Sequence, residues 1–383
     1  MITVKASRER ALLVTVGIKG GSNVVSPEIS QEELAQLAFS AGVEVVGKVI
    51  QHLNKSVNAT YIGKGKLDEI IEMKSTLNYD VIVFDDELTP LQQKNLEDAL
   101  QVKVIDRVAL ILDIFAKRAH TREGKLQVEL AQHQYLLPRL AGQWSHLERL
   151  GGGIGTRGPG ESQLETDRRL IKKRIQKLEE QIEKIRDQRY LNRQNRQRSG
   201  IPVVALVGYT NAGKSTLLNA LCQAGVDSEN KVFTTLDPTT RRIRLHNGKS
   251  ILLSDTVGFI RKLPPVIVSA FRATLEELDE ADLLLNIVDF ASPNAAEECQ
   301  TVEQILVDLK LDLKPRITVL NKIDTLVENN KTWTEQQALD YFYSMPREDD
   351  KNTVFVSASK KWGLMVLLQR AGEILAFKTG YNS

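Results

Sequence analysis

The 383-residue sequence has little cysteine or histidine and no long apolar run. Its two cysteines, Cys222 and Cys299, form no C-x-x-C pair, and its five histidines lack metal-ligand spacing, which disfavours a disulfide framework and a zinc site. The longest apolar runs are too short to cross a bilayer, and the N-terminus lacks the apolar region of a signal peptide. We therefore expect a cytoplasmic, monomeric protein without a membrane span.

The sequence also lacks a strong net charge, since the formal value is only +2. This small total hides a basic arm, because residues 168–198 contain twelve Lys or Arg against four Asp or Glu. A charge run is usually only the solvated face of a helix. The same side chains can also neutralise phosphates and give RNA affinity that does not depend on base sequence.

Short apolar segments alternate with helical ones over residues 1–108. Ser30-Gln31-Glu32-Glu33 has the pattern of a capping box that opens a helix, residues 67–77 are helical, and Thr89-Pro90 opens another helix. Strands are predicted at residues 11–16, 43–50, 81–84 and 102–105. This order indicates a small parallel α/β subdomain.

Residues 109–198 have a helical period of alternating steps of four and three, which is typical of a packed helical seam. Two such seams of similar length flank the glycine-rich segment GGGIGTRGPG at residues 151–160, which predicts an antiparallel helical hairpin with this segment at its tip. Pro138 predicts a break in the first seam. The seams comprise Leu126, Leu130, His133, Leu137, Leu140, Trp144 and Leu147, and then Leu164, Arg168, Ile171, Ile175, Leu178, Ile182 and Ile185.

Residues 153–158 of the tip fit the G-x-G-x-x-G pattern of dinucleotide sites. That pattern binds pyrophosphate only after a strand, and here it follows a predicted helix, so we reject this interpretation. A plain turn between antiparallel helices needs only about 2–5 residues. The ten-residue segment, with Arg157 at its centre, is longer than such a turn requires.

Residues 199–383 predict a doubly wound sheet, with strands at 201–207, 241–245, 251–253, 283–288, 317–320 and 353–356 and a turn at Asn247-Gly248. A G-x-x-x-x-G-K-[ST] motif follows the first strand directly, and a helix over 216–222 follows the motif. Such a loop surrounds phosphate oxygens with backbone N–H groups, while its lysine reaches the β- and γ-phosphates and its serine binds Mg²⁺. The motif comprises Gly208, Tyr209, Thr210, Asn211, Ala212, Gly213, Lys214 and Ser215, with Thr216 next to it.

Asn321-Lys322-Ile323-Asp324 ends another apolar strand and indicates which base is bound. Guanine presents two N–H donors that the Asp324 carboxylate can accept as a pair, whereas adenine would leave that carboxylate unmatched. Lys322 can lie along the base, and Asn321 can brace the phosphate loop. Ser357-Ala358-Ser359, after the last strand, can offer a backbone N–H to guanine O6. The sequence therefore predicts GTP and GDP as ligands.

Two segments are expected to respond to the γ-phosphate. In Asp255-Thr256-Val257-Gly258, Asp255 can hold Mg²⁺ through water and the Gly258 N–H can meet the γ-phosphate. In Phe233-Thr234-Thr235-Leu236-Asp237, one threonine should close on Mg²⁺ and the γ-phosphate; we favour Thr235 and keep Thr239 as the alternative. The predicted catalytic residues are thus Lys214, Thr235 and Gly258, and the predicted Mg²⁺ ligands are Ser215 and Thr235.

Phe259 occupies the position at which many GTPases have a glutamine that orients the attacking water. Phenylalanine cannot hydrogen-bond water, so we expect slow intrinsic hydrolysis unless a partner, another group or a monovalent cation such as K⁺ completes the site. Asn211 could seat that cation, although a turn-capping role fits this asparagine equally well.

Together with residues 106–118 (DRVALILDIFAKR), 121–131 (TREGKLQVELA) and 151–169 (GGGIGTRGPGESQLETDRR), these motifs resemble the HflX family of translation-factor-related GTPases over nearly the whole chain. The resemblance implies an α/β fold in three parts: an N-terminal α/β subdomain, a long helical hairpin and a doubly wound P-loop GTPase domain. It also implies binding to the large ribosomal subunit and, in bacterial members of the family, GTP-linked splitting of stalled ribosomes. The hairpin tip Gly151–Gly160 and the basic arm Arg168–Arg198 are then the expected contacts with rRNA.

Two other functions stay open. An RNA-remodelling NTPase would bind ATP in the N-terminal domain, where Gly63-Lys64-Gly65-Lys66 is the only support and lacks a Walker-type spacing. A scaffold would recruit a protein partner through the hairpin seam. ATP hydrolysis that survives Lys214→Ala would favour the first, and salt-insensitive binding without RNA would favour the second.

Overall fold

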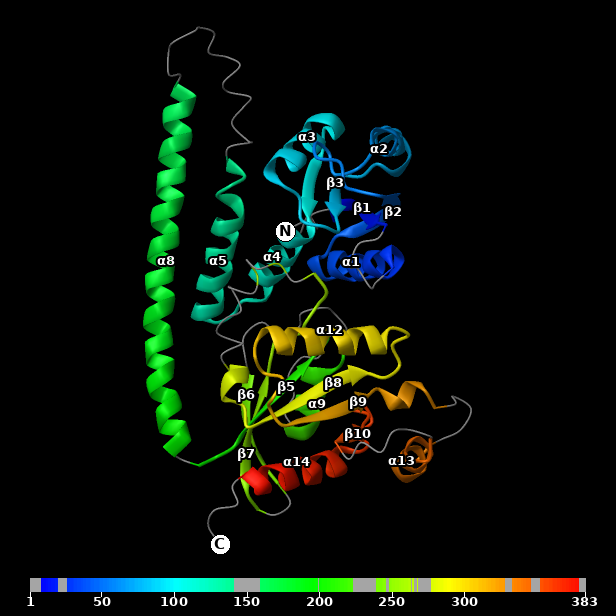
Figure 1. The fold of residues 1–383 in the computed structure, drawn as a ribbon, viewed down its shortest axis with the longest axis vertical. Coiled ribbons are helices and arrows are strands. Elements are labelled where there is room, and N and C mark those ends of the chain that lie inside the picture. The colour runs from blue at the N-terminus through cyan, green and yellow to red at the C-terminus, as the bar shows by residue number, and fades with distance from the viewer. Residues whose placement is uncertain are drawn as a thin grey trace, which may run out of the picture. The chain divides into compact units, whose positions relative to one another are not determined.

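The computed structural model confirms the α/β fold class (Figure 1). It divides into two compact units, one of residues 1–184 with 264–270 and one of residues 185–263 with 271–383. None of the described helices is both long and apolar enough to span a membrane. The structure describes residues 8–19, 26–140, 159–198, 200–222, 239–245, 248–262, 264, 267, 277–327, 333–345 and 352–378, without the side chains of 159–164 and 190–198.

The first unit is built on a parallel sheet in the order β2-β1-β3-β4, and all four predicted strands are present. Alternate residues of β1 point to opposite faces, so Leu12 and Val14 pack on one side, and both sides are covered by helices. β3 is therefore buried along its whole length. The strands are β1 (Arg10–Ile18), β2 (Glu44–Leu53), β3 (Val81–Phe84) and β4 (Lys103–Asp106).

The helices α2 (Lys64–Leu77) and α3 (Pro90–Leu100) match their predicted positions. Thr89 caps α3 as expected, because its hydroxyl accepts from Gln92 N at 3.2 Å while the Gln92 side chain accepts from Thr89 N at 3.0 Å.

The predicted capping box at Ser30 is wrong. Helix α1 (Pro27–Ala41) begins earlier, and the Ser26 hydroxyl caps it by accepting from Ile29 N at 3.3 Å. Ser30 lies inside the helix, where its hydroxyl donates to Asp85 Oδ2 at 2.5 Å. Its partner is thus 55 residues away in sequence, so the local pattern could not reveal it.

Between β4 and β5 (Val203–Gly208), the described residues form three helices: α4 (Arg107–Arg118), α5 (Arg122–Leu136) and α8 (Pro159–Arg198). The break predicted at Pro138 is present, because α5 ends at Leu136. Helix α5 has 15 residues and α8 has 40, and the first predicted seam continues beyond Leu140 into residues that the structure does not describe. Pro159 and Gly160 belong to α8 and not to a tip loop, while Trp144, Leu147 and residues 151–158 lie outside the described residues.

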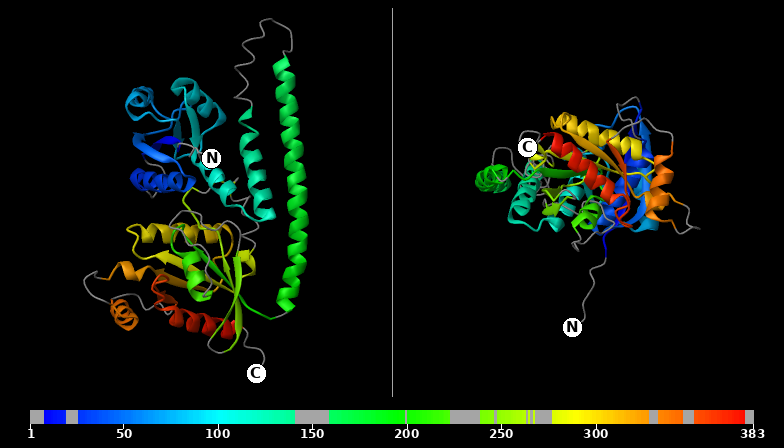
Figure 2. Two further views of the ribbon diagram at one scale, coloured as in Figure 1. Left: turned by 180° about the vertical axis from the view of Figure 1, so that it is seen from behind. Right: turned by 90° about the horizontal axis from the view of Figure 1, so that it is seen from below.

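From Ile171 to Ile185 the seam predicted on α8 coincides with its less exposed face, whereas the seam position Arg168 is exposed. Leu178 is fully buried and Ile171, Ile175 and Ile182 are half-buried, whereas Leu170, off the seam, is 58% exposed. The Arg174 guanidinium binds Glu129 Oε1 of α5 at 2.5 and 2.7 Å. Figures 1 and 2 show α5 and the adjoining part of α8 side by side and running in opposite directions, as an antiparallel hairpin requires.

A buried carboxylate fastens α5 to the sheet of the first unit. Asp106, at the end of β4, is 1% exposed and accepts from Leu88 N, Ala109 N, the Tyr135 hydroxyl and Arg139 Nη2 at 2.9 to 3.2 Å. Burial and the Asp106 charge raise the pKa of Tyr135, so its phenol keeps the proton that it donates.

The second unit has a six-stranded sheet in the order β10-β9-β8-β5-β7-β6, in which only β6 runs antiparallel to its neighbour. Gly248, with φ +78°, lies in the predicted turn between β6 and β7. All six predicted strands are found: β5 (Val203–Gly208), β6 (Thr239–Arg244), β7 (Ser250–Asp255), β8 (Leu283–Asp289), β9 (Arg316–Asn321) and β10 (Thr353–Phe355).

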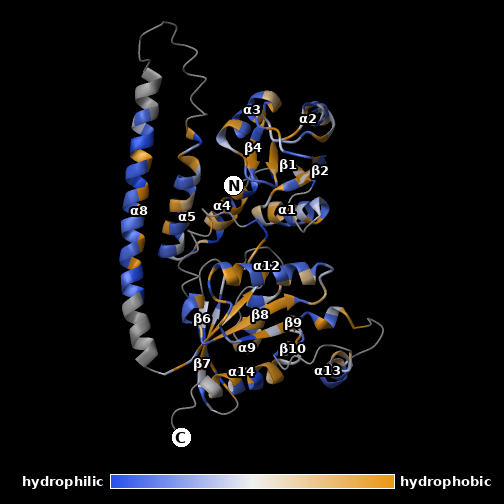
Figure 3. Ribbon diagram, in the orientation of Figure 1, coloured by the Kyte–Doolittle hydropathy of each residue, from blue (hydrophilic) through white to orange (hydrophobic). Residues whose placement is uncertain are grey.

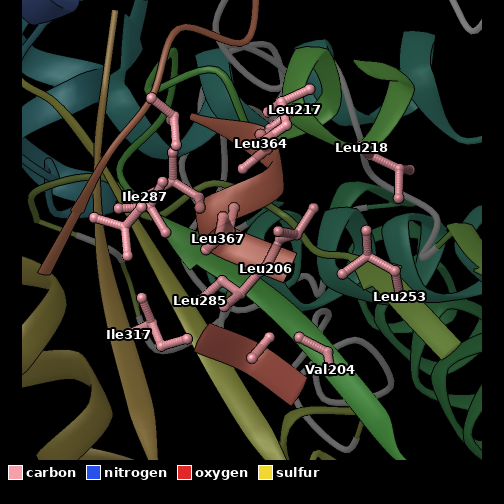
Figure 4. Close-up of a cluster of buried hydrophobic side chains, with 14 of the residues drawn as sticks. Val204, Leu206, Leu217, Leu218, Leu253, Leu285, Ile287, Ile317, Leu364 and Leu367 are labelled. Atoms are coloured by element: carbon pink, nitrogen blue, oxygen red, sulfur yellow. The ribbon is translucent and has the colours of Figure 1, made fainter. Parts of the chain in front are cut away.

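Helices α9 (Lys214–Cys222) and α14 (Leu364–Lys378) pack on one face of this sheet through a cluster that includes Leu206, Leu285 and Leu367 (Figure 4). A second apolar cluster includes residues of α12 (Ala295–Asp308), and α13 (Glu335–Tyr343) lies beside β10. The sheet is thus held rigidly, and the ends of its strands position the site described next.

Candidate nucleotide-binding site

The predicted phosphate loop leaves β5 in a conformation that demands glycine. Gly208 has φ +146°, and a Cβ there would lie 2.2 Å from the Ile287 carbonyl oxygen. Gly213 has φ +95°, and a Cβ there would lie 2.3 Å from Asn321 Nδ2. The loop therefore lies against Ile287 of β8 and Asn321 of β9, with no space for side chains at either glycine. Asn211, at φ +64°, adopts the left-handed turn that suits asparagine.

The Lys214 ammonium lies over this loop. Its Nζ donates to the carbonyl oxygens of Gly208 at 3.0 Å and Tyr209 at 2.6 Å, and the residue is 6% exposed. Burial lowers the pKa of Lys214 to about 8, an effect that the Asp255 carboxylate opposes and the Lys322 charge reinforces. Because burial destabilises the charged form of this lysine, an approaching anionic phosphate would stabilise the ammonium strongly.

A pair of oxygen groups stands beside the ammonium. The Ser215 hydroxyl, at the start of α9, donates to Asp255 Oδ2 at 2.7 Å at the end of β7, and Asp255 is 1% exposed. Neighbouring Thr256 is fixed by its hydroxyl, which donates to the Leu206 carbonyl at 2.6 Å. A hydroxyl and a carboxylate form a hard, oxygen-only donor set, which fits Mg²⁺.

The predicted base-binding residues meet at the ends of β9 and β10. The Ser357 hydroxyl donates to Asp324 Oδ1 at 2.6 Å, and the Ser359 hydroxyl donates to Asp324 Oδ2 at 2.9 Å. Asn321, 1% exposed, joins this end to the phosphate loop, because its Nδ2 donates to the Ala212 carbonyl at 2.8 Å and its Oδ1 accepts from Ala358 N at 3.1 Å. The phosphate and base ends are therefore one connected structure.

Two residues of this site were missed from the sequence. Asp289, at the end of β8, forms an ion pair with Lys322 at 2.7 Å and holds that lysine beside the base-binding loop. A polar residue at the carboxyl end of an apolar parallel strand was the available signal. Arg261, whose backbone N–H binds the Tyr209 hydroxyl at 3.1 Å, carried no such signal.

The Phe259 side chain is buried beside the phosphate loop. Its side chain is 4% exposed and lies in an apolar cluster with Tyr209, Leu278 and Leu284. Gly258 lies against the loop, since a Cβ there would be 2.9 Å from Lys214 Nζ. The side chain at the usual glutamine position is thus part of the core.

The predicted site residues that the structure describes lie together at the carboxyl edge of the sheet. One predicted segment, residues 233–237, is not described. Phe233, Thr234, Thr235, Leu236 and Asp237 lie outside the described residues. The alternative residue Thr239 opens β6 and pairs with Asp255 across the hairpin. The residues brought together are Gly208, Tyr209, Thr210, Asn211, Ala212, Gly213, Lys214, Ser215, Thr216, Asp255, Thr256, Val257, Gly258, Asn321, Lys322, Ile323, Asp324, Ser357, Ala358 and Ser359.

The segment considered for a second ATP site starts α2. Gly63 is the N-cap residue, and its N–H donates to Gln51 Oε1 at 3.0 Å. Lys66 is paired with Glu69 at 2.7 Å on the same helix. These contacts are those of an ordinary helix start and give no support to ATP binding.

Comparisons with known proteins agree with the geometry of this site. Three family models match the chain: "GTP-binding GTPase N-terminal" over residues 28–116, "GTP-binding GTPase Middle Region" over 118–196 and "50S ribosome-binding GTPase" over 203–322. A GTP-binding protein, SsGBP, solved as a complex with GDP, aligns with a TM-score of 0.50 and 28% identity, covering 97% of this chain and 99% of that one.

Two curated relatives are considerably more similar in sequence. GTPase HflX of Caldanaerobacter subterraneus subsp. tengcongensis is 49% identical over 365 residues, which are 94% of this chain and 79% of the relative. GTPase HflX of Escherichia coli K12 is 44% identical over 346 residues, which are 90% of this chain and 79% of the relative. The phosphate-loop motif, the predicted base-binding residues and these relatives lead to one conclusion: the chain belongs to the HflX family of GTPases, enzymes that bind and hydrolyse GTP.

Proposed function

We propose that this GTPase binds the large ribosomal subunit in its GTP-bound state and splits stalled ribosomes. The observation that carries the proposal is the exposed cationic surface of α8 in the same chain as a guanine-nucleotide site. The match of residues 203–322 to the model of 50S ribosome-binding GTPases supports it. The tip Gly151–Gly160 and the arm Arg168–Arg198 are the proposed rRNA contacts.

Helix α8 is suited to RNA because its cations are accessible. Figure 3 shows the described part of α8 as predominantly hydrophilic. Each phosphate that such a side chain neutralises releases counterions and makes the affinity fall with salt. The exposed cations of α8 include Arg168, Arg169, Lys172, Lys173 and Lys177.

Within the GTPase site we assign roles to the predicted residues. Lys214 binds the β- and γ-phosphates, the Gly258 N–H meets the γ-phosphate, and Asp324 accepts the guanine N–H pair. Ser215 and Thr235 would hold Mg²⁺, with Asp255 acting through water. When bound, that ion neutralises charge that develops on the phosphates during hydrolysis.

We infer slow intrinsic hydrolysis, because the Phe259 ring is buried and offers no hydrogen bond to water. Either the ribosome or a monovalent cation seated by Asn211 would complete the site. The remaining proposals concern the whole molecule: a monomeric cytoplasmic protein in three parts, residues 1–108, 109–198 and 199–383.

Sedimentation through a sucrose gradient tests the ribosome proposal. The full chain should travel with purified large subunits when loaded with a non-hydrolysable GTP analogue and less so when loaded with GDP. Equal sedimentation with both nucleotides, or none with either, would refute it. Adding the enzyme with GTP to intact ribosomes should in turn release free subunits.

Charge variants of α8 test whether this helix binds the large subunit through RNA phosphates or through another kind of contact. Lys172→Ala with Lys173→Ala should weaken subunit binding and flatten its dependence on salt, because two phosphate contacts are lost. Glu179→Gln with Glu180→Gln, on the same helix, is the matched control and should not weaken binding. Equal loss in both double variants would point to a contact other than RNA phosphate.

A further inference from the structure

The segment after β7 continues along the phosphate loop. Phe259 N donates to the Gly208 carbonyl at 3.1 Å, and Thr210 N donates to the Phe259 carbonyl at 2.8 Å. Tyr209 and Phe259 thereby form a parallel bridge beyond the named strands. These bonds, which we call the switch pairing, extend the contact between β5 and β7 across the loop that receives phosphate.

The side chain of Tyr209 reinforces the switch pairing at two points. Its ring is 7% exposed and shares an apolar cluster with the ring of Phe259. Its hydroxyl oxygen accepts a hydrogen bond from Arg261 N at 3.1 Å, two residues further along the segment. The Arg261 guanidinium also lies 5.8 Å from the centre of the Tyr209 ring. One phosphate-loop residue thus holds both Phe259 and Arg261.

The switch pairing leaves no space between Gly258 and the phosphate-binding groups. A Cβ on Gly258 would lie 2.9 Å from Lys214 Nζ and 2.9 Å from Thr210 Cα. That Cβ position is one C–C bond, about 1.5 Å, from Gly258 Cα, so Gly258 Cα lies within about 4.4 Å of Lys214 Nζ. A phosphate oxygen directly between them needs about 6 Å, because it requires about 2.8 Å to the ammonium and about 3.3 Å to the carbon. Gly258 must therefore move before a γ-phosphate can lie between it and Lys214, whereas GDP has no phosphate at that position.

We propose that Tyr209 is a positioning residue that keeps the switch pairing closed in the absence of a γ-phosphate, and that GTP binding opens it. The inference deepens the proposed role of Gly258 as the γ-phosphate contact and rests on it. A ligand that binds only the open state has its apparent affinity reduced by the fraction of protein that is open. Tyr209 therefore lowers the affinity for GTP while leaving that for GDP unchanged.

Tyr209→Phe tests this directly, because it removes the hydroxyl and keeps the buried ring. The affinity for a non-hydrolysable GTP analogue should rise by about two- to tenfold, the range for loss of one neutral hydrogen bond, while the GDP affinity stays constant. Fluorescent-nucleotide titration of the full chain measures both. Tyr341→Phe, the same change on the exposed face of α13, is the control and should alter neither affinity.

An unchanged or weaker affinity for the GTP analogue in Tyr209→Phe would overturn the proposal. The titration contains no ribosomes, so a failure of the ribosome proposal would leave its result intact. Amide hydrogen exchange of the natural chain is a second measurement that needs no variant. Peptides with Thr210, Phe259 and Arg261 should be protected without nucleotide and with GDP, and less protected with the GTP analogue; equal protection in all three states would also overturn it.

Discussion

The Ser359 hydroxyl donates to Asp324 Oδ2 at 2.9 Å, while Ser357 occupies the other carboxylate oxygen at 2.6 Å. With a donor on each oxygen, the plane of the carboxylate is fixed before guanine arrives. A group oriented in advance loses less entropy on binding and so gives a higher affinity. Ser359 therefore contributes to the site without needing to touch the base.

Ser359→Ala should lower the GTP affinity by about three- to tenfold, because it removes a hydrogen bond that orients the Asp324 carboxylate without itself contacting the base. The weak affinity for ATP should not change, because adenine does not use the Asp324 pair. Nucleotide titration measures both values. Ser344→Ala removes a similar hydroxyl bond at the end of α13, to the Tyr341 carbonyl at 2.7 Å, and should leave both affinities unaltered.

GTP binding should weaken as pH rises above about 8. Burial lowers the pKa of Lys214 to about 8 in the free protein, so the ammonium loses its proton above that pH. Bound phosphate favours the charged form, so binding takes up a larger fraction of a proton at pH 9 than at pH 7.5. Calorimetry in buffers of different ionisation enthalpy measures this uptake. Phosphate itself is already ionised over this range.

Lys214→Arg provides the control for that titration, since arginine stays charged throughout. Its nucleotide affinity should be lower but nearly independent of pH, and its binding should take up no proton. The assignment to Lys214 fails if the natural enzyme and the variant lose affinity in parallel between pH 7.5 and 9.

Local signals in the sequence were enough for elements whose determinants are neighbours. The four apolar residues of β3 and the Thr89-Pro90 start of α3 lie where predicted, because pattern and capping act over a few residues. The predicted start of α1 was wrong, because the Ser30 hydroxyl does not cap the helix but donates to Asp85, which is distant in sequence. The four-donor environment of Asp106 combines β4, α4 and α5 and could not be read from any one segment.

The candidate site shows the same division. The phosphate-loop motif and Asn321-Lys322-Ile323-Asp324 were identifiable because each is contiguous and follows an apolar strand. Glycine is required at position 213 because a side chain there would collide with Asn321, which is over a hundred residues away in sequence. The burial of Phe259 depends on packing against Tyr209. The sequence showed that Phe259 cannot orient water, but only the structure shows where its ring lies.

Arg107→Met should destabilise the first unit by about 3–5 kcal/mol, the range for breaking a buried ion pair. Arg107 is 1% exposed and binds Asp85 and Glu33 at 2.8 Å each, so its removal leaves two buried carboxylates without that cation. Hydrogen exchange of β1 and β3 peptides under increasing urea follows this unit separately. The control Lys117→Met, which breaks an exposed pair with Asp113, should cost less than about 1 kcal/mol. Similar losses in both variants would mean that the buried cluster is not what stabilises the unit.

A variant of Asn211 can show whether this residue binds a potassium ion or only stabilises the turn of the phosphate loop. At φ +64° the position suits glycine as well as asparagine, so Asn211→Gly keeps the turn and removes only the amide. If the amide seats a monovalent cation, turnover of the natural enzyme should be higher in potassium than in sodium, and the variant should show no difference between the two salts. Phosphate release measured in each salt at equal ionic strength gives the comparison. If Asn211 only completes the turn, the glycine variant will keep the natural rate in both salts, and equal rates for the natural enzyme in potassium and sodium would remove the cation from the mechanism altogether.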